Sequence, residues 1–414
     1  MSGHASRACP GTSPAMKRFV KNTFLILTAF VTVGLSSCIY DKSEEPETAV
    51  EEQPADDQVW VRINVSGNPS ADNTNFSSFD PIHSLRVVIL DSEGKVQFNQ
   101  KERFETPVST YYFNALVKAG KNTFYFIANA DNMNLYESAN SLPTTEEAFF
   151  SQFTLGTTGF EEAVKNLYFD NTYFATPSNP LPLTSKYVVT TEPGVQDLSF
   201  WLVKAATKYT VHFENSRTSE VFLNDLYVSQ LIDKMYLMPH VGSTQETISG
   251  QYWVEWLRDV ADKSHLDESN QGDEAFNDRY GWITDYTVPT PNTPFNLYLV
   301  KEGNIEIPGL QTSAGQAKPE PGTLDLGPFY STEGLNLLPG NAAGIQQYTV
   351  TIKVTDTKDN AVFSEYRVLP NLSALFRNTH VIINITFDES YMHIYGEIAD
   401  WREYTIYGDV TEEK

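Results

Sequence analysis

Ser92 and Lys95 have the spacing of the Ser-x-x-Lys pair found in some acyl-transfer enzymes. That chemistry requires the lysine amine to lie one helical turn from the serine hydroxyl. Here Asp91-Ser92-Glu93-Gly94 follows the apolar run 84–90 and precedes a second apolar run, which is typical of a hairpin turn. We therefore interpret the pair as part of a turn between strands.

The sequence contains no other arrangement of residues that indicates catalysis. It has no His-Glu-x-x-His, no Cys-x-x-Cys and no glycine-rich phosphate loop, and none of its seven histidines forms a ligand-like pair. We therefore expect no catalytic residues, no metal ion and no cofactor, and we do not expect an enzyme.

An acidic segment at 267–278 has some features of a calcium loop. Oxygen-bearing side chains alternate from Asp267 onward, and Gly272 stands at the bend. However, Asp278 replaces the closing glutamate, and no helix is predicted on either side. A solvated acidic loop fits the segment better, and the sequence leaves calcium binding open.

Aromatic residues gather in the acidic stretch 241–295. Exposed aromatics beside acidic groups can stack on sugars, whereas buried ones fill a core. The core interpretation is favoured, and a glycan-binding platform is the alternative. The three tryptophans of that platform would be Trp253, Trp256 and Trp282.

The N-terminal segment predicts export. The basic stretch Met16-Lys17-Arg18 precedes an apolar run of 11 residues, Phe24 to Gly34, which is too short for a bilayer span of about 20 residues. Residues 1–37 are therefore expected to be a signal peptide. Met16 is the better start, and residues 1–15 upstream of it are either a misplaced start or a disordered extension.

The tetrapeptide Leu35-Ser36-Ser37-Cys38 resembles the bacterial lipobox. This resemblance implies that the Cys38 thiol receives a lipid and that a peptidase cleaves before it. Two or more acyl chains hold a protein stably on a membrane, so we expect a surface-exposed lipoprotein of the outer membrane. An ordinary signal peptide that happens to meet a cysteine is the alternative.

The composition of the mature chain limits its partners. Removal of 37 of the 414 residues leaves 377, with 25 Lys and Arg against 53 Asp and Glu, a net charge of −28. Such a surface repels phosphate backbones, so no nucleic acid partner is expected. Because Cys9 lies in the removed segment, the mature chain has no internal disulfide, and its core alone must stabilise it.

Short alternating runs separated by turns predict an all-β chain of two tandem β-sandwiches with few short helices. Val59, Val61, Ile63 and Val65 alternate with polar or aromatic residues in the first strand. One helix is predicted after Pro143, with Thr144 and Glu147 as a capping box and Ala148, Phe149 and Phe153 facing inward. The expected boundaries are a tether at 38–57, a first sandwich at 58–196 and a second at 197–414, which includes an insertion at 241–295 and a long loop at 308–345.

Several segments, taken in their order along the chain, resemble the fimbrillins, the type V pilins of Bacteroides-like bacteria. The resemblance rests on the signal and acidic tether, the first strand 58–66, and the segments 84–91, 119–130 and 198–211. It also rests on Phe376-Arg377-Asn378-Thr379-His380 and the late Ala399-Asp400-Trp401. It implies a transthyretin-like sandwich fold and a fimbrial subunit that acts as stalk, tip or anchor.

The resemblance also implies assembly by strand exchange. A protease cuts after a basic residue in the loop that follows the first strand. The strand leaves, and a C-terminal strand of another subunit fills the groove. Here the lost strand would carry Val59, Val61, Ile63 and Val65, and the donor region would carry Trp401, Tyr404 and Ile406.

The sequence departs from this pattern because residues 67–83 contain no Lys or Arg. Either another protease acts or the first strand is retained, as in the membrane anchors of the family. The expected partners are other fimbrial subunits, the outer membrane and a host or bacterial surface ligand. A surface glycan-binding lipoprotein of a Gram-negative bacterium is the alternative function.

Overall fold

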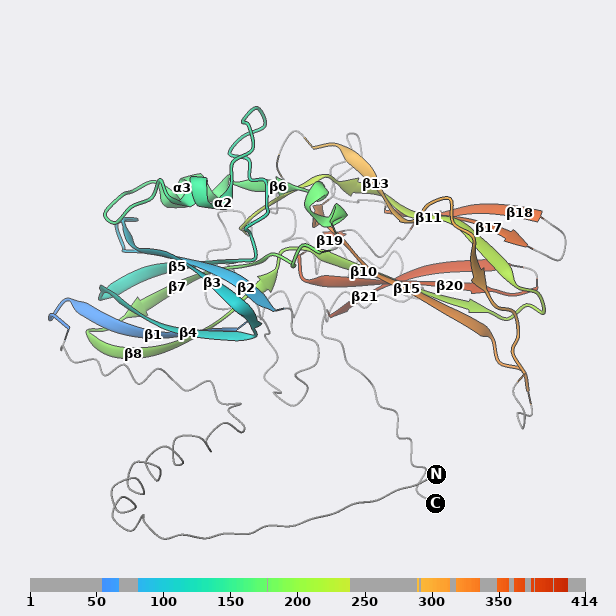
Figure 1. Cartoon of the computed structure of the whole chain (residues 1–414), viewed down its shortest axis with the longest axis horizontal. Helices are drawn as coiled ribbons and strands as arrows, with labels where there is room; N and C mark the ends of the chain where they lie inside the picture. Colours follow the sequence, from blue (N-terminus) through green and yellow to red (C-terminus); the bar gives the residue numbers. More distant parts are fainter. Residues whose placement is uncertain are drawn as a thin grey trace, which may run out of the picture. The chain divides into compact units, whose positions relative to one another are not determined.

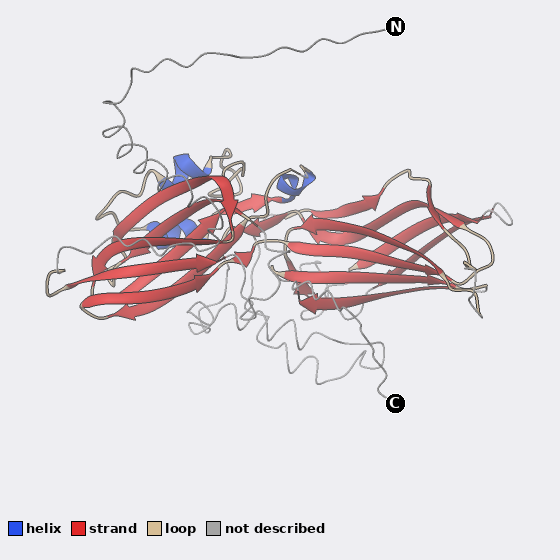
Figure 2. Ribbon diagram, turned by 60° about the horizontal axis from the view of Figure 1, so that its bottom comes forward, coloured by secondary structure: helices blue, strands red, loops and turns tan. Residues whose placement is uncertain are grey.

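The chain is built mainly from β-strands, with only short helices. The computed structural model describes residues 54–66, 81–176, 178–238, 289, 292–312, 318–335, 348–356, 361–368, 374–375, 377–389 and 391–400. Within them the strands pair into several sheets, as the alternating sequence predicts, and the fold is an all-β sandwich (Figures 1 and 2).

The first group of elements, in chain order, is β1 Gln58–Ser66, β2 Ile82–Leu90, β3 Val96–Val108, β4 Thr110–Lys118, β5 Gly120–Ala128, α2 Glu146–Phe150, α3 Phe160–Lys165, β6 Tyr168–Asp170, η1 Asn171–Ala175, β7 Leu183–Thr191, β8 Gly194–Trp201 and β9 Val203–Lys204. The second group is β10 Thr207–Asn215, β11 Val221–Ile232, β12 Lys234–Tyr236, β13 Pro294–Val300, β14 Ile305–Ile307, β15 Gly322–Ser331, β16 Gly334–Leu335, β17 Thr349–Asp356, β18 Ala361–Val368, β19 Ala374–Leu375, β20 Thr379–Phe387 and β21 Met392–Asp400.

The first group forms three layers. A sheet of order β4-β1-β8 packs on a sheet of order β3-β2-β5-β7-β9, and α2 and α3 cover the other face of the second sheet (Figure 1). Strand β2 is therefore buried on both faces: Val87 and Ile89 face the first sheet, whereas Val88 and Leu90 face the helices. This explains why 84–90 is nearly continuous in apolar residues instead of alternating.

The structure corrects the predicted helix start. Thr145 caps α2, since its side chain accepts a hydrogen bond from the Ala148 N–H, so the predicted Thr144 box is wrong by one residue. Ala148 is exposed, contrary to the prediction, whereas Phe149 is buried and Phe153 packs against the same core. The second helix, α3, was not predicted.

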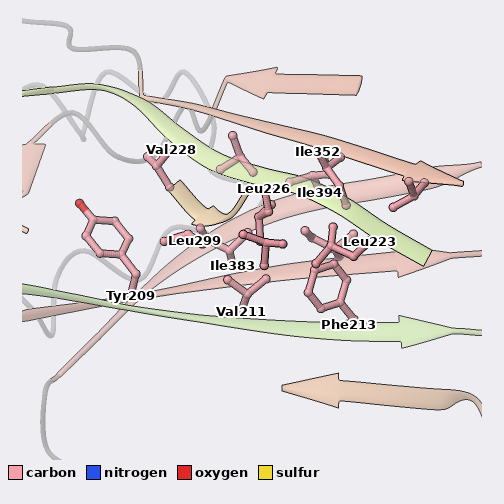
Figure 3. Packing of buried hydrophobic residues seen from close by; sticks show 14 of the residues in the cluster. Tyr209, Val211, Phe213, Leu223, Leu226, Val228, Leu299, Ile352, Ile383 and Ile394 are labelled. Atoms are coloured by element: carbon pink, nitrogen blue, oxygen red, sulfur yellow. The ribbon is translucent and has the colours of Figure 1, made fainter. Parts of the chain in front are cut away.

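Most strands of the second group form a sandwich of two sheets, β15-β10-β20-β21 and β13-β11-β17-β18, with β14 also paired to β11. The short strand β12 pairs instead with β6 of the first group, and β16 pairs with β19. Their facing side chains interdigitate in one core, in which Val211, Leu226, Ile352 and Ile383 are at most 1% exposed (Figure 3). The prediction of a loop over 308–345 is wrong in part, because β15 pairs with β10 along nearly its whole length.

The expected division between residues 196 and 197 falls inside β8, which pairs with β1. The chain then passes through β9, which pairs with β7, into β10 of the other sandwich. Ala205 and Ala206 lie at this crossing and are fully buried. The predicted break at Thr191-Glu192-Pro193-Gly194 is instead the short connection between β7 and β8, which belong to different sheets of the first group.

Candidate strand-exchange site around the first strand

Strand β1 lies in the middle of its sheet. It pairs antiparallel with β4 over all nine residues, with Val61 opposite Ala115, and parallel with β8, with Ile63 opposite Leu198. Both of its backbone edges are therefore hydrogen-bonded. Departure of β1 would leave two unpaired edges facing one another, each able to accept a new strand.

The inward side chains of β1 fill a continuous apolar groove. Val59, Val61, Ile63 and Val65 are each at most 1% exposed, as the alternation predicted. They share one core with Val87, Phe124 and Phe126 of the opposite sheet and with Phe200 of β8, among others. Burial of each aliphatic side chain contributes about 1.5–3 kcal/mol, so the four together contribute roughly 6–12 kcal/mol.

That contribution is comparable with the whole stability of an ordinary domain, about 5–15 kcal/mol. The groove therefore cannot stay empty in a folded protein, and it requires either β1 or another alternating strand. This requirement makes the site suited to exchange of one strand for another.

The outward face of β1 adds little stability. Arg62 pairs with Asp197 of β8 at 2.6 Å, but the two side chains are 52% and 71% exposed. Exposed ion pairs contribute about 0–1 kcal/mol. Packing and the backbone ladders, rather than charge, hold the strand in place.

The ends of β1 are joined to the neighbouring strands by backbone hydrogen bonds. The Ala119 N–H donates to the Asp57 carbonyl at 2.8 Å, and the Leu202 N–H donates to the Ser66 carbonyl at 2.8 Å. The pairing therefore extends to both ends of the strand.

Arg377, in the motif that carried part of the resemblance, is fully buried. Its guanidinium lies against the Glu333 carboxylate and donates to the Leu237 carbonyl at 2.9 Å, the Tyr236 carbonyl at 2.6 Å and Thr184 Oγ1 at 3.1 Å. Because Thr184 lies on β7 and Arg377 lies two residues before the start of β20, one side chain joins the two groups of sheets. Sequence reasoning found the motif but assigned no role to the arginine.

Several predicted site residues lie outside the described residues. They are the lipobox Leu35, Ser36 and Ser37 with Cys38, the tryptophans Trp253, Trp256 and Trp282, the acidic loop 267–278 and the donor residues Trp401, Tyr404 and Ile406. Over the part of the chain that is described, no three His, Cys, Asp or Glu side chains are grouped as metal ligands, and no helix is long and apolar enough to span a membrane.

Comparison with known proteins gives matches among solved structures only. No protein-family model and no curated protein matches the sequence. The tip fimbrial protein Mfa3 of Porphyromonas gingivalis is 13% identical, with a TM-score of 0.46, and the match covers 83% of this chain and 100% of that one. A putative cell adhesion protein of Parabacteroides distasonis is 10% identical, with a TM-score of 0.46, and the match covers 84% and 97% of the two chains.

A fimbrilin (FimA) of Porphyromonas gingivalis also matches, at 10% identity and a TM-score of 0.43, over 83% of this chain and 98% of that one. Fimbrial proteins are thus among the solved structures that this chain resembles, as its sequence motifs predict.

Proposed function

We propose that the chain is a non-enzymatic structural subunit of a cell-surface fimbria, made of two β-sandwiches and assembled by strand exchange. The observation that carries this proposal is the position of β1. It lies between β4 and β8 and closes an apolar groove with Val59, Val61, Ile63 and Val65. A removable central strand of this kind is what an exchange mechanism requires.

The sandwiches would divide at Ala205–Ala206, where the chain leaves β9 and enters β10. The replacement strand would come from the C-terminal region 401–410 of another subunit, with Trp401, Tyr404 and Ile406 as its anchoring side chains. Cys38 would carry lipid and hold the subunit on the outer membrane until assembly, or permanently if β1 is retained.

Retention of β1 is favoured by the positions of the basic residues. Residues 67–83 contain no Lys or Arg. Arg62 is the nearest basic residue on the N-terminal side, and its backbone is paired on both edges within the sheet. A protease specific for basic residues would therefore find no accessible bond between β1 and β2, which fits an anchor subunit better than a stalk subunit.

The test is the N-terminus and intact mass of the protein isolated from the surface of its own host. A lipidated start at Cys38, in protein that co-purifies with fimbriae, would support an anchor that retains β1. A start beyond Val65 in the fimbrial fraction would support a polymerising stalk or tip subunit. Absence of the protein from purified fimbriae in both wild type and a Cys38→Ser strain would overturn the proposed function.

A further inference from the structure

A lysine and two carboxylates meet where β3, the end of β5 and the start of α2 come together. Lys101 Nζ lies 2.6 Å from Asp131 Oδ1 and also contacts Glu146 Oε2. The side chains of Lys101, Asp131 and Glu146 are 11%, 25% and 2% exposed. A primary amine is thus held between two carboxylates in a place that water reaches poorly.

The neighbours of these groups hold them in place. Arg86 forms a buried ion pair with Glu146, which holds the Glu146 carboxylate in place beside Lys101. Ser84 donates to Asp131 Oδ2, and Arg103 Nε donates to Asp131 Oδ1 at 2.9 Å. Both oxygens of Asp131 therefore accept hydrogen bonds from groups other than the lysine.

We propose that Lys101 and Asp131 condense into an intramolecular amide, with Glu146 as the group that accepts a proton from the amine. The bond that forms joins Lys101 Nζ to Asp131 Cγ, and the bond that breaks joins Cγ to one carboxylate oxygen. Of the three ammonium protons, one stays on the amide nitrogen. The other two leave with the departing oxygen as water, one directly and one through Glu146, so no oxidant or other reactant is needed.

The geometry favours this step over the same reaction in solution. Lys101 Nζ lies 2.6 Å from Asp131 Oδ1, and Oδ1 is bonded to Cγ. Nζ therefore needs to move only a short way to reach the carbon that it would attack. Ser84 and Arg103 would stabilise the negative charge that develops on the carboxyl oxygens. Burial alone would raise the pKa of Asp131, but hydrogen bonds from Lys101 and Ser84 outweigh it and hold that pKa below its usual range. The reactant is therefore an ammonium–carboxylate pair, and the reaction is slow and follows folding.

The product would supply a cross-link that the chain otherwise lacks. Asp131 follows β5, and Lys101 lies on β3, the edge strand of the same sheet, with β2 between them. The amide would therefore tie the edge of the sheet to its centre. The mature chain has no cysteine pair that could do this.

The test is the intact mass of the full-length protein, expressed without export so that its N-terminus stays unprocessed, and followed during incubation after folding. The expected result is a shift to a mass one water lower, with a tryptic fragment that contains both Lys101 and Asp131. Lys101→Arg keeps the cation but removes the nucleophile, so it should keep the full mass. Glu146→Gln should slow the shift by at least tenfold, and Asp131→Asn should lose one ammonia and give the same cross-linked product.

Two results would overturn the inference. One is an unchanged wild-type mass after prolonged incubation of folded protein, with circular dichroism as the check on folding; the three groups would then be an ion-pair cluster only. The other is loss of one water in Lys101→Arg at the wild-type rate, which would place the dehydration elsewhere in the chain.

Discussion

Arg377 and Glu333 form a buried ion pair, in which the Glu333 carboxylate accepts from both the backbone N–H and the guanidinium of Arg377. The two side chains are 0% and 2% exposed. Three further acceptors, on β7 and around the end of β12, complete the guanidinium hydrogen bonds. This pair stabilises the junction between the sheet that contains β10 and β20 and the sheets of the first group.

Arg377→Met is expected to lower the free energy of unfolding by about 3–5 kcal/mol, because it removes the guanidinium from a buried ion pair with the Glu333 carboxylate. Urea denaturation measures the change. Arg62→Met is the matched control, since Arg62 pairs with Asp197 at the surface and should cost at most about 1 kcal/mol. Equal effects of the two substitutions would contradict the assignment of Arg377 as a buried anchor.

Val61→Ala is expected to destabilise the protein by roughly 1.5–3 kcal/mol, because it removes buried methyl groups from the groove under β1. Val195→Ala on the adjacent β8 is the control, because that side chain is 50% exposed. The control should change stability by less than about 0.5 kcal/mol. A small effect of Val61→Ala would mean that the inward side chains of β1 do not hold it in place.

Thr145→Ala is expected to cost about 1 kcal/mol, because Thr145 Oγ1 accepts from the Ala148 N–H at 3.2 Å at the start of α2. Thr144→Ala, one residue earlier, should be nearly neutral. Thermal unfolding of the two variants distinguishes them. A larger loss of stability in Thr144→Ala than in Thr145→Ala would instead support the capping box predicted from the sequence.

Tyr136 is expected to make stability fall in alkali. Burial and its hydrogen bond to Asp170 raise the pKa of Tyr136 to about 12, from 10.0 for the free side chain. Because the folded state holds this proton more tightly, its contribution is complete below pH 10 and is lost as the pH rises from 10 through about 12. The free energy of unfolding, measured as a function of pH, should fall less steeply over that range in Tyr136→Phe than in the wild type. Identical slopes would contradict the raised pKa of Tyr136.

The strands that stand between two partners were the most predictable from the sequence. In β1 and β17 the apolar residues recur at every second position, and Val61 and Ile352 are buried as that period requires. The period is a local property, and a half-buried sheet imposes it directly. Strand β20 follows the same rule through Val381 and Ile383.

Strand β15 was missed because its sequence is rich in the residues that usually end strands. Gly322 begins it, and a Cβ there would lie 2.0 Å from the Pro308 carbonyl oxygen, so the glycine serves close packing rather than a turn. Gly327 has a φ of +116°, beside the register shift in the β10 pairing. Both requirements come from neighbours far along the chain, and composition alone cannot reveal them. The same holds for Arg377, whose burial depends on Glu333.

The mixed pairing of β1 has a consequence for the geometry of any fibre built through this groove. A strand that replaces β1 must run parallel to β8 and antiparallel to β4 to restore both ladders. Reversed entry would exchange the two hydrogen-bond patterns, so that the strand would run parallel to β4 and antiparallel to β8 and would not reproduce the ladders of β1. Contacts between successive subunits would then be heterologous and head-to-tail, with no two-fold axis. The filament would therefore be polar, with two chemically different ends.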